Sequence, residues 1–497
     1  AGSPGIYRAS PDGAPVVNVQ SAPRPPDRDD DGVAVVDMGP LESPPLGGFH
    51  AVQPFRLFDS REGTAPKLGP ASAFLMTATG AGPIPASGVR AVVLNVTGVF
   101  PSVATHLSLS PGISIPREDL PDGWLLEGFI IGETTSNVNL PAGSVVPNLV
   151  TVGLNDEGRF MVSNNAGYVD VVADVVGWYD AGPPTDPTAA PLDADAATAR
   201  FAERLADRPA AAAGLERWVT SSAPTGPRTA ADFAPVEAGA ALHPLAPARI
   251  LDTRAGLGAP KARIGANGKV DLQVTGAGGV PADGVSAVVL NVTGVFPTVP
   301  THVTAWPAGT TKPLASNLNL VPGQTSANLV TVKVGATGAV SLGNHTGQVD
   351  LVADVVGWYD TGGGVGGHFA DTPPTRLYDS RGEDLFPFPI VEPLAPGETR
   401  TIDLSGLDVF SSLGGGVPES AHTVVLNVTG IATAPTHLTV WPGGAVPATS
   451  SLNLAAGETR ANLVIVEVGP DRTITIRNNS GSTHVIVDLF GWFTAPK

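Results

Sequence analysis

Cysteine is absent from this sequence of 497 residues. Its absence excludes disulfide bonds, zinc sites built on thiolates and catalysis by a thiol nucleophile. It does not decide the compartment, because secreted proteins can also lack cysteine. Positive charge is scarce as well: 28 Lys and Arg stand against 46 Asp and Glu, which gives a formal net charge of −18. Such a chain repels phosphate backbones and no basic patch offsets this, so we expect no nucleic acid partner.

Long hydrophobic runs are also missing. No run approaches the ~18 apolar residues of a membrane span, so we expect no membrane insertion. The chain begins with Ala1 and shows no basic and apolar leader, which we interpret as a removed signal segment or a trimmed chain. An acidic chain without cysteine and rich in Gly, Pro and Thr favours an extracellular bacterial protein.

Glycine and proline, by contrast, are abundant, at 60 and 49 residues. So many helix breakers disfavour long helical bundles and coiled coils. The hydrophobic share of 42% is too high for a wholly disordered chain. At about 150 residues per domain, the length suggests about three domains.

The sequence contains three copies of one order of motifs. The segment Ala91–Pro101 returns almost unchanged at Ala287–Pro297 and more loosely at Thr423–Gly430. Each copy opens with Arg-x-x-Asp-Ser/Thr-Arg and closes with Asp, two apolar residues, Gly and two aromatic residues. We therefore predict three domains, called repeats 1, 2 and 3 below, over residues 49–180, 243–360 and 368–497. The other segments are a Pro-rich acidic N-terminal arm (1–48), an insert in repeat 1 (113–135) and a linker (181–241).

Within a repeat the hydrophobic pattern has the period of a β-strand. Thr301–Trp306 alternates polar and apolar residues, whereas Ala287–Gly294 is apolar on both faces, as in a covered central strand. Turn residues separate the strands about every 8–12 residues. The linker carries one helical pattern, over Asp193–Ala213. We predict an all-β chain of three tandem antiparallel β-sandwich or jelly-roll-like repeats with one helical linker, which can pack around a pseudo-threefold axis.

Each repeat places an aspartate inside its closing apolar strand. A buried carboxylate needs a partner, because an unpaired buried charge is very costly. We predict that an arginine of the opening motif pairs with it and clasps the first strand to the last. The residues of this predicted structural clasp are Arg61, Asp174, Arg254, Asp354, Arg381 and Asp488. The alternative is that the recurring charged motif binds carbohydrate or phosphate.

One acidic run resembles the start of an oxygen-rich calcium loop. Asp27, Asp29 and Asp31 alternate with other residues before a glycine, and Asp37 can add a further ligand. The twelfth position of such a loop is Met38 rather than Glu, and no helix flanks it. A weak Ca²⁺ site therefore stands against a solvated acidic turn. No other cofactor is indicated.

No catalytic constellation is evident. His106, His302 and His437 recur at one strand position, but neither a recurring Ser or Cys nucleophile nor a Gly-x-Ser-x-Gly elbow accompanies them. A hydrogen-bonded strand residue is the simpler interpretation of each histidine. We therefore expect no enzyme.

Two further recurring features allow a structural and a glycan-related interpretation. Glycosylation sequons lie inside the apolar strands, where a glycan would not fit, so we expect their asparagines to satisfy backbone groups. The aromatic pairs that close the repeats could stack on sugar rings or cap each core. The residues concerned are Asn95, Asn291 and Asn427, and the tryptophans Trp178, Trp358 and Trp492.

The motifs of repeat 2 are Arg-Ile-Leu-Asp-Thr-Arg (249–254), Gly-Val-Pro-Ala (279–282), Val-Val-Leu-Asn-Val-Thr (288–293), Ser-Asn-Leu-Asn (316–319), Ala-Asn-Leu-Val-Thr-Val (327–332) and Asp-Val-Val-Gly-Trp-Tyr (354–359). In this order they resemble a β-module of secreted and cell-surface proteins of actinobacteria, found also in minor tail proteins of their phages. Repeat 1 departs from the module through its insert, and repeat 3 through Ser451 and Phe493. The family has no assigned catalytic residues, so the resemblance implies none.

In that family the module is usually attached to hydrolases or other effectors, whereas here three modules and their connections occupy the sequence. The resemblance therefore implies a non-enzymatic extracellular structural or adhesive surface protein. The alternatives are a phage virion component, at the tail tip or capsid surface, that contacts the host cell wall, and a glycan-binding, lectin-like protein. The expected partners are other copies of the chain, assembly proteins or cell-wall glycans.

Overall fold

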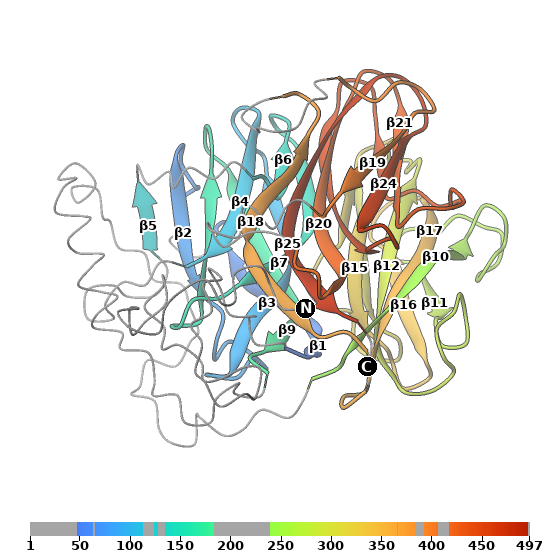
Figure 1. Cartoon of the computed structure of the whole chain (residues 1–497), viewed down its shortest axis with the longest axis horizontal. Helices are drawn as coiled ribbons and strands as arrows, with labels where there is room; N and C mark the ends of the chain where they lie inside the picture. The colour runs from blue at the N-terminus through green and yellow to red at the C-terminus, as the bar shows by residue number, and fades with distance from the viewer. Residues whose placement is uncertain are drawn as a thin grey trace, which may run out of the picture.

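The computed structural model describes residues 47–62, 65–112, 124–127, 135–182, 239–364, 366–382, 392–405 and 417–495. Every regular element in these residues is a β-strand. The strands form six small antiparallel sheets, two from each repeat, arranged in a propeller-like ring around a common centre (Figure 1). Within the described part of the chain, no helix is long and apolar enough to cross a membrane.

Repeat 1 contributes one inner and one outer sheet. The inner sheet comprises, in spatial order, β1 (Phe49–Asp59), β9 (Asp170–Asp180), β3 (Val89–Val99) and β7 (Val145–Gly153). The outer sheet comprises β5 (Trp124–Glu127), β2 (Ser72–Thr77), β8 (Arg159–Asn164), β4 (Thr105–Pro111) and β6 (Val138–Leu140). The strand β5 belongs to the insert and extends the outer sheet by one strand.

Repeats 2 and 3 have the same strand order without that extra strand. In repeat 2 the inner sheet comprises β10 (Leu242–Asp252), β17 (Asp350–Asp360), β12 (Val285–Val295) and β15 (Thr325–Lys333), and the outer sheet β11 (Lys269–Gln273), β16 (Ala339–Asn344), β13 (Thr301–Pro307) and β14 (Leu318–Leu320). In repeat 3 the inner sheet comprises β18 (Phe369–Asp379), β25 (Thr483–Thr494), β20 (Ala421–Ala432) and β23 (Thr459–Glu467), and the outer sheet β19 (Thr399–Asp403), β24 (Thr473–Asn478), β21 (Thr436–Trp441) and β22 (Leu452–Leu454).

The central strands are apolar on both faces because each face meets a different core. In β12, Val288, Leu290 and Val292 contribute to the core between the two sheets of repeat 2. Ala287 and Val289 point the opposite way and contribute to a fourth core, which all three repeats share. The strands β3 and β20 alternate in the same manner.

The shared core lies where the three inner sheets meet. Tyr179, Tyr359 and Phe493 occupy equivalent positions at the ends of β9, β17 and β25, and Phe49 and Phe369 pack among them. The hydroxyl oxygens of Tyr179 and Tyr359 are 2.6 Å apart, so these two buried groups satisfy each other. Because this apolar surface is buried only when the repeats meet, its burial favours the closed ring over separate repeats.

Backbone hydrogen bonds also close the ring, at the end where β1, β10 and β18 begin. Three antiparallel bridges connect the repeats in pairs: Gly47–Phe369, Phe49–Ala240 and Leu242–Gly367. Each bridge consists of two N–H···O bonds between 2.7 and 2.9 Å long. Every repeat is thereby joined to both of the others.

The fold class predicted from the sequence is wrong. The described residues do not form three separate tandem β-sandwich or jelly-roll-like repeats, but one closed ring of six sheets whose three inner sheets meet in a shared core. The prediction fails because the central strands have a second apolar face, and neighbouring repeats cover that face. The pattern within one repeat cannot show what covers that face. The predicted helix over Asp193–Ala213, the arm up to residue 46 and most of the insert lie outside the described residues.

Candidate functional site

A buried ion pair connects the first and last strands of each repeat. In repeat 2 the antiparallel register sets Arg249 of β10 opposite Asp354 of β17, and Arg249 Nε lies 2.8 Å from Asp354 Oδ1. The equivalent pairs in the other repeats are Arg56–Asp174 and Arg376–Asp488. The three aspartates are at most 1% exposed. Strand pairing and charge therefore hold the same two strands together.

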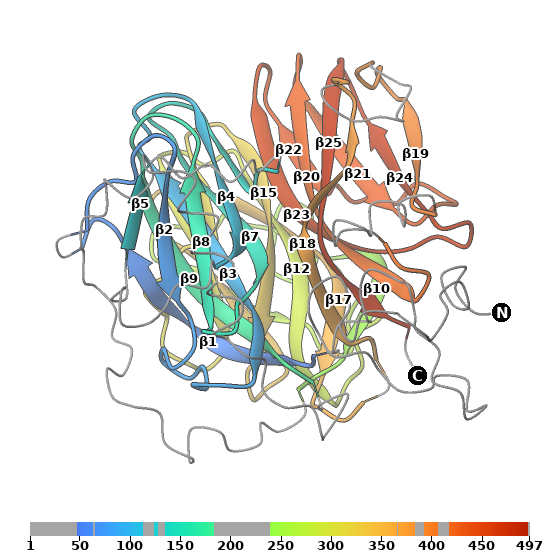
Figure 2. The same cartoon turned by 60° about the vertical axis from the view of Figure 1, so that its left-hand side comes forward.

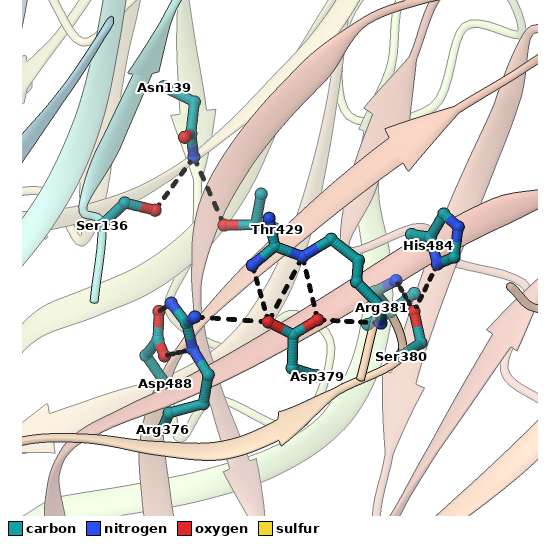
Figure 3. Close-up of polar contacts among 10 residues, drawn as sticks. Ser136, Asn139, Arg376, Asp379, Ser380, Arg381, Thr429, His484 and Asp488 are labelled. Carbon is teal, nitrogen blue, oxygen red and sulfur yellow. Dashed lines mark hydrogen bonds and ion pairs between the residues drawn. The ribbon is translucent and has the colours of Figure 1, made fainter. Parts of the chain in front are cut away.

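The arginines of these pairs are the first of the opening motif, whereas the sequence-based prediction named the second. Arg381 contacts the motif's own Asp379, at 2.6 Å between Nη2 and Oδ2, as Arg61 contacts Asp59 and Arg254 contacts Asp252. Figure 3 shows the resulting row of alternating charges, Asp488–Arg376–Asp379–Arg381. The second arginine lies beyond the end of the strand, in a turn that bends it back onto Asp379.

Burial favours the protonated form of both aspartates of the row, but their hydrogen bonds and neighbouring charges give them different pKa values. It raises the pKa of Asp488 to about 6, although Arg376 opposes the shift. Burial likewise raises the pKa of Asp174 to about 6 against the effect of Arg56. For Asp379, burial is outweighed by hydrogen bonds from the side chain and backbone of Arg381, so its pKa is lowered. The row thus combines one carboxylate that is easily protonated with one that is not.

Asparagine side chains form hydrogen bonds between the repeats. At the junction of repeats 2 and 3, Asn462 Nδ2 donates to Asn291 Oδ1 at 3.0 Å, and the backbone N–H of Leu329 donates to Asn462 Oδ1 at 2.9 Å. Asn291 Nδ2 in turn donates to the carbonyl oxygen of Ser450 at 2.6 Å. The same set of bonds occurs at the other two junctions, through Asn95, Asn328, Leu149 and Ser316, and through Asn427, Asn148, Leu463 and Ser136.

These contacts place the sequon asparagines at the junctions between repeats, which the sequence analysis did not predict. Asn95, Asn291 and Asn427 are at most 4% exposed, and each bonds to a backbone carbonyl of a neighbouring repeat rather than of its own. The available signal was the recurrence of Asn-Leu-Val at residues 148, 328 and 462. One repeat by itself gives no reason to place that asparagine against another repeat.

The ion pairs and the asparagine bonds meet at two of the junctions. The backbone N–H of Ser316 in repeat 2 bonds to Asp174 of repeat 1, and that of Ser136 in repeat 1 bonds to Asp488 of repeat 3. Beside Asp354, at the third junction, lies a cavity of about 20 Å³ lined partly by Asn291 and Ser450. A cavity of this size holds about one water molecule. The charged residues therefore serve the contacts between repeats as well as those within them.

The three tryptophans considered for glycan stacking are covered. Trp178 and Trp492 are 5% and 4% exposed, and Trp358 is half-buried. The ring of His50 stacks on Trp178 at 3.8 Å between centroids, and His243 stacks on Trp358 at 4.0 Å. Each histidine also lies within 3.2 Å of an aspartate that follows its tryptophan, Asp180 or Asp360. A sugar ring would have to displace these contacts to reach the tryptophans.

The recurring strand histidines lie on the outer sheets, in β4, β13 and β21. His302 stacks on His345 at 4.5 Å between ring centroids, and burial, followed by the charges of His345 and Lys312, lowers its pKa to about 4. Burial also lowers the pKa of His106 and of His437. All three are consequently weaker bases than an exposed histidine.

The calcium prediction concerns residues outside the described part of the chain. Asp27, Asp29, Asp31 and Asp37 all precede residue 47. Among the described residues, no group of three or more His, Asp or Glu side chains is arranged to hold a metal ion.

An open groove lies between repeats 1 and 2. It encloses about 600 Å³, and β1 residues 51–56 form one wall while Pro313, Leu314 and Lys333 of repeat 2 contribute to the other. Gln53 Nε2 donates to the carbonyl oxygen of Thr311 at 3.0 Å, which connects the two walls. The lining is mainly apolar and proline-rich, and it suits an extended apolar segment better than a reacting small molecule.

Comparisons with known proteins place the chain in no family. No family model matches it, and no curated protein matches it. Among solved structures, a chain from "The Triple Jelly Roll Fold and Turret Assembly in an Archaeal Virus" aligns over 92% of this chain and 99% of its own length, at 8% identity and a TM-score of 0.15. A chain from Sulfolobus Turreted Icosahedral Virus aligns over 91% of both chains, also at 8% identity and a TM-score of 0.15. TM-scores this low do not establish a shared fold.

Proposed function

We propose that this chain is a non-enzymatic structural protein of an extracellular surface, and that its three repeats act together as one rigid building block. The observation that supports the proposal is that the recurring polar side chains are paired with other groups of the protein. The recurring Arg, Asp and Asn residues, the usual material of active sites, bond to one another and to neighbouring repeats. Their interactions hold strands together and leave no free constellation around the described histidines.

The extracellular setting rests on the sequence. An acidic chain without cysteine and rich in Gly and Pro, with motifs that resemble a secreted actinobacterial module, suits the outside of a cell. An adhesive contribution, or binding of cell-wall glycans, belongs to the same proposal but needs a surface other than the three covered tryptophans. The open groove between repeats 1 and 2 is the surface that we propose for this binding.

The second candidate, a virion component that contacts the host cell wall, needs the same rigid block. Immunogold labelling with negative-stain imaging of native material separates the two. A surface protein gives label spread over cell envelopes, whereas a virion component gives label at a fixed symmetric position on particles. Label confined to the cell interior would contradict both.

The non-enzymatic part of the proposal has its own test. Purified protein is incubated with cell-wall polysaccharide, and new reducing ends are measured over time. We expect no release above a heat-denatured control. Sustained turnover that depends on the folded protein would overturn this part.

A further inference from the structure

Three equivalent loops lie together at one end of the molecule. Apical loop 1 (residues 100–104) follows β3, apical loop 2 (296–300) follows β12, and apical loop 3 (432–435) begins at the last residue of β20. The strands β9, β17 and β25 end in the shared core beside the three backbone bridges and begin at the opposite end, where they pair with the ends of β3, β12 and β20. The loops therefore lie on the side away from the bridges, at the upper end of Figure 2.

Apical loops 1 and 2 each present an exposed phenylalanine on a strained backbone. Phe100 and Phe296 are 60% and 56% exposed, and both have a φ of 47°. A positive φ is unfavourable for a residue with a Cβ, and strain of this kind points to a function. Further exposed apolar side chains adjoin them: Val103 and Tyr168 in repeat 1, and Val299 and Val321 in repeat 2.

Apical loop 3 shows that the fold does not require this arrangement. The backbone N–H of Ala432 bonds to Glu458 as that of Phe100 bonds to Ser144, so the two positions are equivalent. The loop is one residue shorter, because no proline follows Ala432. Ala432 is buried, and its φ is not positive. The longer loops thus present a phenylalanine that the shorter loop does without.

The three apical loops are also uncharged, although the chain carries a net charge of −18. Apical loops 1, 2 and 3 contain no Asp, Glu, Lys or Arg. Three carboxylates at or just before the first residues of β9, β17 and β23, beside the loops, form ion pairs: Asp170–Lys67 at 2.9 Å, Asp350–Arg263 at 3.0 Å and Glu458–Arg460 at 2.7 Å. Two copies that meet through these loops therefore bring no charged loop residues together.

We propose that apical loops 1 and 2 form the face through which two copies of this chain pair head to head. A twofold axis between the two loops sets loop 1 of one copy against loop 2 of the other, and the reverse, so each exposed phenylalanine meets an apolar loop. Apical loop 3, with its internally paired Glu458, then faces its own counterpart. The inference rests on the proposed function, since it gives the building block its first contact with another copy.

The double variant Phe100→Gly/Phe296→Gly tests the pairing. Glycine accepts the positive φ, so we expect the variant to fold with an unchanged or higher melting temperature while it loses the apolar contact. In sedimentation velocity over a concentration series, the wild type should shift toward the dimer and the double variant should remain monomeric. Leu314→Ser, which removes a side chain that is 73% exposed in the groove between repeats 1 and 2, is the matched control and should pair like the wild type.

Other outcomes overturn the proposal. A wild type that stays monomeric throughout the series, or a double variant that pairs like the wild type, refutes it. Flotation with phosphatidylcholine vesicles that is seen for the wild type and lost in the double variant would assign the loops to a lipid surface instead. A monomeric wild type that labels cell envelopes would refute the pairing alone, whereas turnover of polysaccharide by a paired protein would refute the proposed function alone.

Discussion

At the scale of single residues, the amide of Asn462 illustrates how two repeats are joined. Its Nδ2 donates to Asn291 Oδ1 and to the carbonyl oxygen of Ser451, and its Oδ1 accepts a bond from the backbone N–H of Leu329. An amide carries both donors and an acceptor in one rigid plane, which no other small side chain except glutamine offers. Removing it leaves buried groups without partners in both repeats.

We therefore expect Asn462→Ala to lower the free energy of unfolding by about 2–4 kcal/mol, since each buried group left unsatisfied costs about 1–3 kcal/mol. Urea unfolding followed by tryptophan fluorescence measures the loss. Asn479→Ala, at an exposed position near the end of β24, is the control and should change little. Equal losses for the two variants would mean that the bonds between repeats contribute nothing measurable.

The two arginines of the opening motif differ in burial and should differ in importance. Arg376 faces Asp488, which is fully buried, whereas the side chain of Arg381 is 30% exposed and pairs with Asp379. We expect Arg376→Gln to lower the free energy of unfolding by about 3–5 kcal/mol, because it leaves a buried charge unpaired. For Arg381→Gln we expect a loss of about 1 kcal/mol or less.

A double-mutant cycle assigns the loss from Arg376→Gln to the pair. The double variant Arg376→Gln/Asp488→Asn should lose less stability than the sum of the two single losses. The carboxylate that Arg376→Gln alone leaves unpaired is absent from the double variant. Unfolding by urea gives all four free energies. Additive losses would show that Arg376 acts through packing and not through its charge.

At the scale of elements, glycines in the central strands set how closely the two sheets of a repeat approach. A Cβ on Gly294 of β12 would lie 2.3 Å from Leu320 Cδ1 of β14, and Gly98 and Gly430 are equally close to Leu140 and Leu454. Each outer sheet therefore fits over the inner one only where the side chain is missing. The Asn-Val-Thr-Gly motif is thus a packing motif as well as a junction motif.

Gly294→Ala should lower the free energy of unfolding by about 1–3 kcal/mol, as overpacking of a core does. Adding Leu320→Ala should relieve the clash and restore part of the lost free energy of unfolding. It cannot restore all of it, because the smaller side chain leaves a cavity. Gly265→Ala, where no atom lies within 4 Å of the added Cβ, is the control and should be neutral. Thermal unfolding followed by circular dichroism compares the variants, and an unaffected Gly294→Ala would contradict the packing explanation.

How far the sequence predicts these elements depends on whether the relevant neighbour lies within one repeat. The strand character of Thr301–Trp306 and the need of Asp354 for an arginine both follow from local pattern and burial. The choice of Arg249 over Arg254 depends on strand register, which the motif alone does not fix. The second face of the central strands and the partner of Asn291 depend on other repeats, so a pattern within one repeat could not reveal them.

At the scale of the whole molecule, the buried acids should make stability depend on pH in an unusual direction. The pKa values of Asp174 and Asp488 are raised to about 6, so between pH values of about 4 and 6 the folded state binds more protons than the unfolded state. Stability from these groups is therefore full at the acid end of this window and falls as pH rises. The lowered pKa values of Asp59 and Asp379 act oppositely, because stability from them is lost as the pH falls below about 4.

The lowered pKa values of His106, His302 and His437 oppose the buried acids over much of the same window, so the effect of the acids is measured by comparing the wild type with Asp488→Asn. A series of thermal melts from mildly acidic to mildly alkaline buffers measures the profile. Asp488→Asn removes one of the raised groups, so the melting temperature of the wild type minus that of the variant should fall as the pH rises from about 4 to about 6. A difference between wild type and variant that does not fall from pH ~4 to pH ~6 would contradict the assignment.

The bridge between Gly47 and Phe369 constrains the order in which the repeats assemble during synthesis. The ribosome makes the first partner more than 300 residues before the second, as their numbers show. Repeats 1 and 2 can join as soon as both are synthesised, but the ring cannot close until repeat 3 has begun to emerge. The last quarter of the chain therefore closes the ring. In a product truncated before repeat 3, one side of the ring is open and the aromatic residues of the shared core face solvent.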